Sequence, residues 1–439
     1  MAGGVKVNES RCRGCANCIK SCPTEAIRVI DGLMRIIPDL CIDCGECIRS
    51  CESKAISVNE DEWDLIKSRE ETILMADPTF YVQAAPYSRP RLMKEALESL
   101  ELTDIAEYAA IAFDLAAYAA ANLIREGGDH RPFISTYCPA VIRLIQINFP
   151  ELVERILPVE SPLETAVTLW RSATGSKKNV TLVSPCPAKA TLARNPVGRT
   201  KSSLSYVVSV SKVIRDLLAH NVKVTGEGMK TIARRWLLWS ISGGESRHIS
   251  AFLDKGMTSI SVSGLRNTMD LLKELELGRL DGIDFIECRA CDLGCIGGTG
   301  TYESRFLSHL RLENLETEWL PAQEEMEVIR EWYEKGIWRL DTPIPVKERL
   351  PLSQNLEEAM AKLREMDAIY AGLPHIDCGA CGRPSCRALA EDIVRGQGDE
   401  TDCIFKLRER ISLLSGEIHD LSSRLPHTIH PTKKRRSVS

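Results

Sequence analysis

Residues 11–23, RCRGCANCIKSCP, and residues 41–51, CIDCGECIRSC, carry eight of the 17 cysteines in this chain. In both stretches the spacing is C-x2-C-x2-C-x3-C, and the following segments CPTEAIRV and CESKAISV repeat 29 residues apart. The opening MAGGVKVNESR has no apolar stretch typical of a secretory signal, so we expect a cytoplasmic protein. In that reducing compartment, clustered cysteines indicate metal binding rather than disulfides.

The repeated spacing is that of the bacterial two-cluster ferredoxins, which residues 5–58 resemble. In such runs the fourth cysteine ligates the other cluster. The pattern therefore predicts two 4Fe–4S clusters, one on Cys12, Cys15, Cys18 and Cys51, the other on Cys41, Cys44, Cys47 and Cys22. Zinc is the competing interpretation, but zinc ligands usually come as two pairs separated by a longer loop. One departure is Glu52, which stands where the first run has Pro23.

Composition narrows the class of protein. The 439 residues allow about three domains. A hydrophobic content of 44% supports a sizeable core, and a net charge of −5 gives no reason to expect nucleic acid or an anionic membrane as a partner. The most membrane-like stretch, residues 105–123, contains Glu107 and Asp114. It predicts a buried or amphipathic helix of a soluble protein and no membrane span.

The region 72–310 alternates between expected strands and helices, which indicates an α/β domain. We predict a strand and turn in 73–86, buried strands in 180–187 and 258–264, a helix over 266–278 and a further strand over 282–288. Cys138, Cys186 and Cys291 each follow an expected strand. Ligands at strand ends converge in α/β sheets, so these cysteines are expected to share one site.

Three segments of this region, STYCPAVIRL (135–144), SPCPAK (184–189) and FIECRACDLGCIGG (285–298), resemble the three signatures of the FeFe hydrogenases. The resemblance covers most of 78–310 and implies a 4Fe–4S cluster on Cys138, Cys186, Cys291 and Cys295. It also implies that Cys295 bridges to a two-iron subcluster, where hydrogen is made or split. Cys288 matches no ligand, and we interpret it as a small buried hydrophobic residue.

The chain departs from catalytic members of that family along the proton path. Tyr137 stands where they carry a proton-transferring cysteine, and a phenol with a pKa of about 10 is a poor relay near neutral pH. Leu157 occupies the position of a relay serine. The stretch FDLAAYAAANL (113–123) has no carboxylate after Asp114, where catalytic members have relay glutamates.

The expected two-iron pocket also departs from the family. Ser184 and Arg289 replace two methionines, and Tyr87 replaces a small residue. At the packing density of protein interiors, two tyrosines and an arginine leave little room for a diiron subcluster. Lys189 matches the lysine that contacts the diiron cyanide ligands, and it is the one catalytic candidate if a diiron site exists. The other interpretation of Lys189, an ion pair with a nearby acid, stays open.

The last part of the chain adds a third cysteine group. Residues 311–372 are charged with a helical pattern, and LDTPIPVKERLP (340–351) is the expected linker. Cys378, Cys381, Cys386 and Cys403 follow the spacing C-x2-C-x4-C-x16-C. This spacing resembles the small iron–sulfur domain of corrinoid iron–sulfur proteins and of some membrane electron-transport complexes, and it implies a further 4Fe–4S cluster, with zinc as the alternative. A helix is expected from Pro384 to a stop at Gly396.

Apolar residues at spacings of 4, 3, 4, 3 and 4 follow, namely Leu407, Ile411, Leu414, Ile418, Leu421 and Leu425. This heptad seam is consistent with a homodimer contact or with a helix that packs on its own domain. The final KKRR run (433–436) is expected to be a solvated tail.

The sequence thus predicts an α+β ferredoxin domain (1–60), an α/β FeFe-hydrogenase-like domain (72–340), a small four-cysteine iron–sulfur domain (355–406) and a heptad helix with a basic tail (407–439). The predicted function is electron transfer or redox sensing with four 4Fe–4S clusters and no hydrogen turnover, working with redox protein partners or in a larger electron-transfer complex. Alternatives are a low-activity or sensory FeFe hydrogenase and a carrier for cluster assembly. No G-x-G-x-x-G follows an expected strand, so we expect no nucleotide or flavin site.

Overall fold

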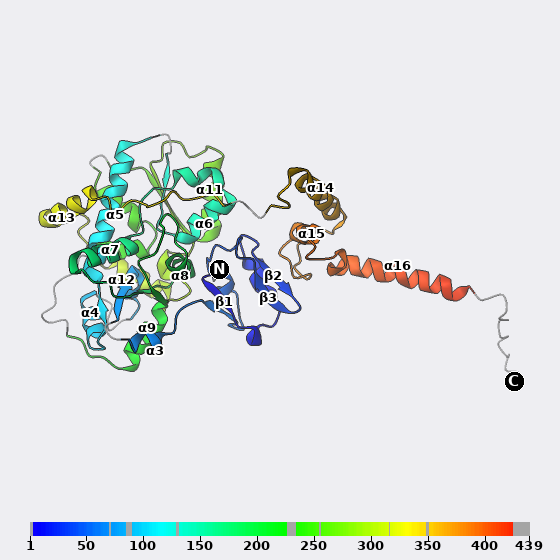
Figure 1. Ribbon diagram of the computed structural model, residues 1–439, viewed down its shortest axis with the longest axis horizontal. Helices are drawn as coiled ribbons and strands as arrows, with labels where there is room; N and C mark the ends of the chain where they lie inside the picture. Colours follow the sequence, from blue (N-terminus) through cyan, green and yellow to red (C-terminus); the bar gives the residue numbers. More distant parts are fainter. Residues whose placement is uncertain are drawn as a thin grey trace. The chain divides into compact units, whose positions relative to one another are not determined.

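The computed structural model describes residues 3–69, 72–84, 90–128, 131–225, 234–253, 256–315, 317–347 and 351–424. Tyr87, Leu425 and the KKRR run lie outside these residues. The chain forms two compact units, one of residues 1–26 and 36–349, the other of residues 27–35 and 350–439. Figure 1 labels the helices and strands of both units. The four domain boundaries expected from the sequence stay predictions.

The amino-terminal part of the first unit shows the expected internal repeat. β1 (Val5–Val7) pairs antiparallel with β4 (Ile56–Val58), and α1 (Asn17–Ser21) and α2 (Glu46–Arg49) lie in the two cysteine loops. Left-handed backbone recurs 29 residues apart at three pairs of positions: Gly14 and Asp43, Ala16 and Gly45, Glu25 and Lys54. Because residues other than glycine rarely adopt this conformation, its recurrence shows that both loops bend in the same way.

The central part of the first unit contains two parallel sheets, with strand orders β6-β5-β8-β9 and β10-β11-β7. The strands are β5 (Ile73–Ala76), β6 (Thr103–Asp104), β7 (Phe133–Ile134), β8 (Val180–Val183), β9 (Tyr206–Val208), β10 (Ser259–Ser263) and β11 (Phe285–Arg289). β5 and β8 are buried along their whole length, as strands of a parallel sheet covered on both faces are. The strands expected in 73–86, 180–187, 258–264 and 282–288 are all present.

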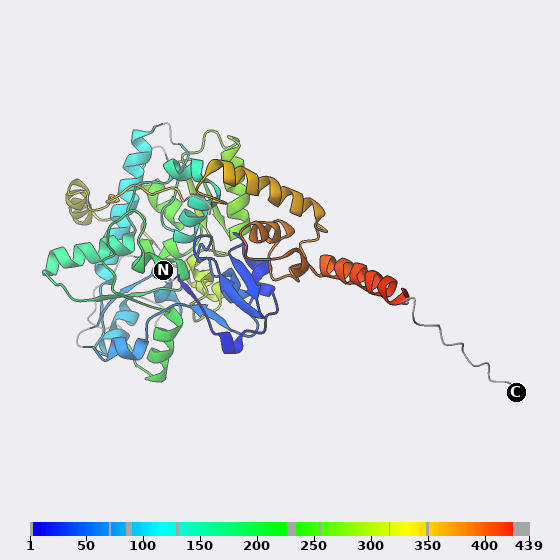
Figure 2. The ribbon, with the colours of Figure 1, turned by 45° about the vertical axis from the view of Figure 1, so that its right-hand side comes forward.

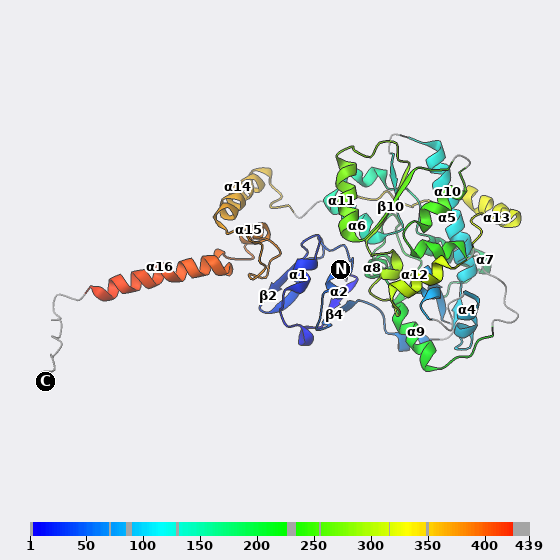
Figure 3. The same cartoon turned by 180° about the vertical axis from the view of Figure 1, so that it is seen from behind.

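One expectation about these strands was wrong. The stretch 258–264 does form β10, but the strand is partly exposed and not buried. The physical reason is its position, because β10 lies at the edge of its sheet with β11 as its one neighbour; Figure 3 shows it beside α11 (Leu265–Glu276). Its alternating serines suit an edge strand with one solvated face.

Helices cover both sheets. They are α3 (Trp63–Lys67), α4 (Pro90–Glu98), α5 (Ala106–Glu126), α6 (Pro139–Asn148), α7 (Pro162–Thr174), α8 (Pro187–Arg194), α9 (Val210–Ala219), α10 (Gly244–Ala251), α11, α12 (Arg305–Glu313) and α13 (Gln323–Glu334). The alanine-rich stretch that resembled a membrane segment is α5, and most of its alanines lie in the main hydrophobic core. None of the helices in the described part of the chain combines the length and apolar character needed to span a bilayer.

The second unit joins the hairpin β2 (Ile27–Ile30) and β3 (Leu33–Ile36) to the carboxyl-terminal helices α14 (Leu356–Gly372), α15 (Cys386–Val394) and α16 (Ile404–Ser423). The Val29 amide donates to the Gly382 carbonyl at 2.8 Å. Arg28 forms a buried ion pair with Asp392, with Nε–Oδ2 and Nη2–Oδ1 distances of 2.7 and 3.0 Å. The expected helix starts at Cys386, two residues after Pro384, because the Ser385 side chain caps it by accepting from the Ala388 amide.

Candidate iron–sulfur sites

The amino-terminal cysteines form two groups. Electrostatic interactions join Cys22 to Cys41, Cys44 and Cys47, so the fourth cysteine of the first run lies with the first three of the second. Cys18 interacts in the same way with Cys12 and Cys15. This is the crossed arrangement that the ferredoxin spacing predicts for the second cluster. The assignment of Cys51 to the first group stays a prediction.

The repeat extends to the hydrogen bonds that the sulfurs accept. The Ala26 amide donates to Cys22 Sγ at 3.3 Å, and 29 residues later the Ala55 amide donates to Cys51 Sγ at 3.2 Å. Burial raises the pKa of Cys18 to about 11 and that of Cys47 to about 12. A buried thiol of this kind stays protonated near neutral pH unless a cation binds it, and a metal deprotonates its thiolate ligands. The donor set therefore fits an iron–sulfur cluster.

The four cysteines expected at the central cluster come together around one cavity. Cys138 and Cys186 are the N-cap residues of α6 and α8, and a proline follows each at the first helical position. Cys291 follows β11, and Cys295 begins a short 3-10 helix (Cys295–Gly297). All four line the same cavity. Proline at the first helical position fixes where each helix begins, so the Cys-Pro pairs place two thiols at helix N-termini. Burial raises the pKa of Cys186 well above that of an exposed thiol.

Cys288 lies outside that cavity. It is fully buried in the same hydrophobic cluster as α6 residues such as Val141, and burial raises its pKa far above the ordinary value of a thiol. Among the described residues, no group of three or more His, Cys, Asp or Glu side chains is close enough to hold a single metal ion. A 4Fe–4S cluster needs no such group, because its ligands are four thiolates spread over the cluster.

Tyr137, Lys189 and Arg289 line the same cavity as the four cysteines. The ring of Tyr137 contacts both cations, with Lys189 Nζ at 4.0 Å and the Arg289 guanidinium carbon at 4.6 Å from its centroid. The two cations are attracted to the negative face of the ring. The Tyr137 hydroxyl is buried and has no hydrogen-bond partner among the described residues. Burial raises the pKa of Tyr137 well above that of an exposed phenol.

Each cation is also held by buried carboxylates. Lys189 Nζ lies 2.5 Å from Asp77 Oδ2, and the two side chains are 3% and 0% exposed. Burial opposes the lysine charge most strongly, but Asp77 together with Tyr137, Cys295 and Cys186 outweighs it, so the pKa of Lys189 is raised. Arg289 Nη2 lies 2.7 Å from Glu245 and 3.3 Å from Glu287. The ion pair that was one of two open interpretations of Lys189 is therefore present, with Asp77 as the acid.

The positions of the expected proton relay are apolar or paired. Leu157 is buried in the main core. Asp114 is bound by Arg235 through Nε and Nη2 at 2.6 and 2.5 Å, and His248 Nε2 lies 3.2 Å away. Among the described residues, neither the Leu157 nor the Asp114 side chain forms a hydrogen bond with the Tyr137 hydroxyl.

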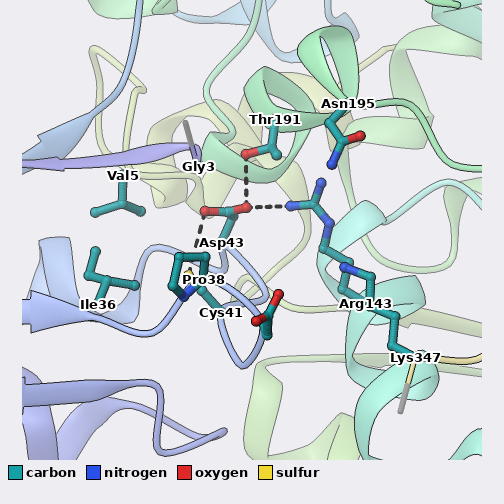
Figure 4. Close-up of a pocket in the computed structure, with 11 residues that line it drawn as sticks. Gly3, Val5, Ile36, Pro38, Cys41, Asp43, Arg143, Thr191, Asn195 and Lys347 are labelled. Atoms are coloured by element: carbon teal, nitrogen blue, oxygen red, sulfur yellow. Dashed lines mark hydrogen bonds and ion pairs between the residues drawn. The ribbon is translucent and has the colours of Figure 1, made fainter. Parts of the chain in front are cut away.

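The loop of the second ferredoxin cluster is fastened to the helices that hold the central cysteines. Asp43, between Cys41 and Cys44, accepts from Thr191 Oγ1 of α8 at 2.8 Å and from the Gly4 amide at 2.9 Å, and it forms an ion pair with Arg143 of α6. Figure 4 shows Thr191 and Arg143 converging on the carboxylate at the wall of a cavity of about 140 Å³. One buried side chain therefore connects the cysteine loop to both α6 and α8.

Arg49 makes a second connection, directly to a cysteine. Its Nη2 donates to Cys291 Sγ at 3.3 Å and to the Gly297 carbonyl at 2.5 Å, while Nη1 pairs with Glu46. Cys44 of the same loop lines the central cavity. The cysteine loop predicted to hold the second ferredoxin cluster therefore contacts the cavity lined by the four central cysteines.

The carboxyl-terminal cysteines lie around a small core of their own. Cys386 and Cys403 are buried in it, Cys381 packs against it, and Cys378 is exposed. Electrostatic interaction joins Cys381 to Cys378. The Cys386 amide donates to Asp377 Oδ1 at 2.6 Å, which fixes the start of α15 beside the loop. The arrangement is compatible with the fourth predicted cluster.

Comparisons with known proteins agree with this division of the chain. Residues 70–227 and 240–299 match the family model described as iron only hydrogenase large subunit, C-terminal domain. Residues 4–52 match a 4Fe-4S dicluster domain, and residues 373–405 match a putative Fe-S cluster domain. Comparison with curated proteins gives no match.

Among solved structures, variants of the FeFe hydrogenase HydA1 from Chlamydomonas reinhardtii are similar at 16% identity, with TM-scores of 0.46 and 0.47, covering 66% of this chain and 97% of theirs. A HydA structure that reports stepwise H-cluster assembly is similar at 16% identity and a TM-score of 0.46, covering 65% of this chain and 97% of its own. The assignment of the chain to a family rests on the matches to the family models. The chain belongs to the FeFe hydrogenase superfamily, as a large-subunit-like iron–sulfur protein with an N-terminal dicluster domain and a C-terminal Fe–S domain.

Sequence reasoning missed Asp43 and Arg49. The sequence contains no signal for Arg49, because its counterpart 29 positions earlier in the repeat is Lys20, which is also basic and is exposed. Spacing alone does not show which of two equivalent repeat residues contacts the rest of the chain and which lies in solvent. Asp43 corresponds to Gly14, and an acid in place of glycine at a left-handed position was a visible departure.

Proposed function

We propose that this protein is an iron–sulfur electron-transfer or redox-sensing protein that holds four 4Fe–4S clusters and does not turn over hydrogen. The observation that carries the proposal is the contact of Tyr137 with Lys189 and Arg289 in the cavity lined by Cys295. Both cations belong to buried ion pairs, and removing one partner of such a pair is strongly destabilising. A diiron subcluster bridged by Cys295 would compete for this space with the side chains of Tyr137 and Arg289.

Proton supply supports the same proposal. Hydrogen turnover needs a group that exchanges protons near neutral pH at the reacting site. Burial raises the pKa of Tyr137 above its already high ordinary value, and its hydroxyl has no partner among the described residues. Leu157 and the Arg235-bound Asp114 offer no relay behind it.

The contacts between the two cysteine sites support a role in electron transfer. A 4Fe–4S cluster, when bound, accepts and releases single electrons at a potential set by its hydrogen bonds and exposure. Asp43 and Arg49 hold the second ferredoxin loop against the central site, and Cys44 of that loop lines the central cavity. Redox protein partners, or the other subunits of a larger complex, would exchange electrons with this chain, and the thiol-rich sites suit a reducing cytoplasm.

Infrared spectroscopy of the protein, co-expressed with hydrogenase maturation proteins and purified without oxygen, tests the proposal. We expect no bands of iron-bound carbonyl or cyanide, and an iron content of about sixteen atoms per chain for four cubanes. A catalytic FeFe hydrogenase matured in the same cells is the positive control. Carbonyl and cyanide bands, with about eighteen iron atoms per chain, would overturn the proposal in favour of a low-activity or sensory hydrogenase in which Lys189 contacts the diiron unit.

A further inference from the structure

The helix α16 carries a heptad seam that no described residue buries. It runs from Ile404 to Ser423, and none of its residues is buried in the described part of the chain. The seam consists of Ile404, Leu407, Ile411, Leu414, Ile418 and Leu421, which are between 41% and 66% exposed. Figure 2 shows α16 extending away from α14 and α15 of its own unit. The interpretation of this helix as one that packs on its own domain has no support within that unit.

The pattern of side chains along the seam identifies the kind of partner. With Ile404 at heptad position a, isoleucine occupies every a position and leucine every d position of the helix. The flanking e and g positions are polar or charged, namely Arg408, Arg410, Ser415, Glu417, Ser422 and Arg424. Apart from Phe405 and Leu413, the apolar residues of α16 lie at a and d. Such a narrow stripe is typical of a coiled coil, whereas a helix that covers a globular core needs a wider apolar face. Its partner is therefore another heptad helix.

The charges favour a second copy of this chain in the antiparallel direction. When two α16 helices overlap fully in that direction, Ile404 faces Leu421 of the second copy, Leu407 faces Ile418, and Ile411 faces Leu414. The same register brings the g-position Arg410 of each helix beside Glu417 of the other. In the parallel direction Arg410 faces Ser415 and Glu417 faces Ser422 of the second copy, so neither charge has an opposite charge beside it. Opposite charges at flanking positions set partner choice and orientation in coiled coils.

From this exposed seam and these charges, we propose that the protein is a homodimer held by an antiparallel two-stranded coiled coil of α16. The helix of 20 residues is about 30 Å long, close to three heptads. That length is near the lower limit for a coiled coil, so the dimer dissociates on dilution. The inference concerns α16 of the second unit and does not depend on whether hydrogen is turned over.

Analytical ultracentrifugation of the full-length, cluster-loaded protein under argon tests the stoichiometry. We expect a species of about twice 48.8 kDa that gives way to monomer on dilution. Ile411→Asp places a charge in the seam and should yield monomer at every concentration. Leu413→Asp is the matched control, because Leu413 is an apolar residue of the same helix, 62% exposed and off the seam, and it should leave the dimer intact. A wild-type monomer, or an Ile411→Asp dimer as tight as that of the control, would overturn the proposal.

A charge exchange tests the direction. Arg410→Glu places two glutamates opposite each other in the antiparallel register and should weaken the dimer about tenfold or more. Adding Glu417→Arg in the same chain restores the pairing and should restore the affinity. Arg408→Glu makes the same change of charge at a position that faces Ser415, so its effect should be smaller. Equal effects of Arg410→Glu and Arg408→Glu, or no rescue in the double variant, would contradict the antiparallel arrangement.

Discussion

At the scale of single residues, Arg49 is the side chain whose role can be measured most directly. It brings a positive charge and an N–H donor to Cys291 from a loop whose own cysteines are predicted to bind another cluster. Its side chain is 27% exposed, so solvent screens part of this interaction. Hydrogen bonds to ligand sulfurs and nearby charge tune the potential of an iron–sulfur cluster. We therefore expect Arg49 to favour the reduced, more negative form of the central cluster.

Arg49→Gln should make the potential of that cluster more negative. Losing one charge-assisted hydrogen bond of about 1 kcal/mol corresponds to roughly 40 mV for a one-electron couple. A redox titration followed by electron paramagnetic resonance measures the shift. Arg49→Lys, which keeps the charge but not the fork of donors, should fall between wild type and Arg49→Gln.

Arg194→Gln is the matched control for that titration. Arg194 binds Asn59 and Asp61 of the amino-terminal domain and contacts no cysteine among the described residues. It should leave the central potential unchanged. If both glutamine variants shift the potential equally, the effect comes from loosened domain contact, and the role assigned to Arg49 is wrong.

Single residues also show what the sequence could and could not predict. The cysteine spacing limits which thiols can approach one another, because a short loop leaves few ways to place them, and the ligand sets of the clusters stay predictions. The partner of Lys189 could not be chosen, because Asp77 lies 112 positions away and only the parallel pairing of β5 with β8 brings the two together. Tyr87 lies outside the described residues, so the role expected for it in filling the cavity stays a prediction.

At the scale of elements, the short strand β6 carries a buried acid whose protonation should affect stability. Asp104 accepts from the Tyr81 hydroxyl at 2.7 and 2.9 Å, and burial raises its pKa from 3.8 to about 7. The folded state therefore holds a proton that the unfolded chain loses at lower pH. Its contribution to stability is fully present below about pH 4 and is lost as pH rises through about 7.

Asp104→Asn should reduce this pH dependence, because the amide cannot ionise and can still accept from Tyr81. Between pH 5.5 and pH 8 the raised pKa corresponds to an upper limit on the order of 2 kcal/mol, because only the interval from pH 5.5 to about 7 contributes. Denaturant unfolding at about pH 5.5 and pH 8 measures it. Burial also raises the pKa of Glu160 to about 7, so part of the pH dependence of stability should remain in this variant.

The control for Asp104→Asn is Asp64→Asn, since the Asp64 side chain is 96% exposed. It should keep the wild-type dependence of stability on pH. Identical pH dependence in the two variants would show that Asp104 already ionises in the folded protein, contrary to our expectation.

The elements were predicted well where burial and periodicity agreed. The strands at β5 and β8 and the helices α5, α11, α13 and α14 follow apolar patterns that local sequence is enough to specify. The prediction that β10 is buried was wrong because its place at the sheet edge depends on strand order, which residues 258–264 alone do not specify. Strand order is a property of the assembled sheet.

At the scale of the whole molecule, the carboxyl-terminal iron–sulfur region and the hairpin β2–β3 belong to one compact unit. The sequence did not predict this, because Arg28 and Asp392 are 364 positions apart. Their side chains are 7% and 5% exposed, and Asp392 also binds Arg383 at 3.1 Å. Removing one side of such a buried pair costs about 3–5 kcal/mol.

Arg28→Ala should therefore release the hairpin from the carboxyl-terminal region. Hydrogen exchange followed by mass spectrometry should show faster exchange in peptides that contain Val29 and residues around Gly382, whose hydrogen bond joins the two segments. Arg387→Ala, at an exposed position of α15, is the control and should leave both peptides protected. Unchanged protection in Arg28→Ala would mean that the backbone contact alone holds the hairpin.

The Asp43 carboxylate has a consequence for protein engineering. A ferredoxin module taken from another protein can reproduce every cysteine of this one and still lack an acid between the first two ligands of its second run. Such a chimera would leave Arg143 buried without its counter-charge and would lose the hydrogen bond to α8. Ferredoxin modules that suit this scaffold are therefore distinguished by one residue that is not a predicted ligand, and a library of grafts could be screened at that position first.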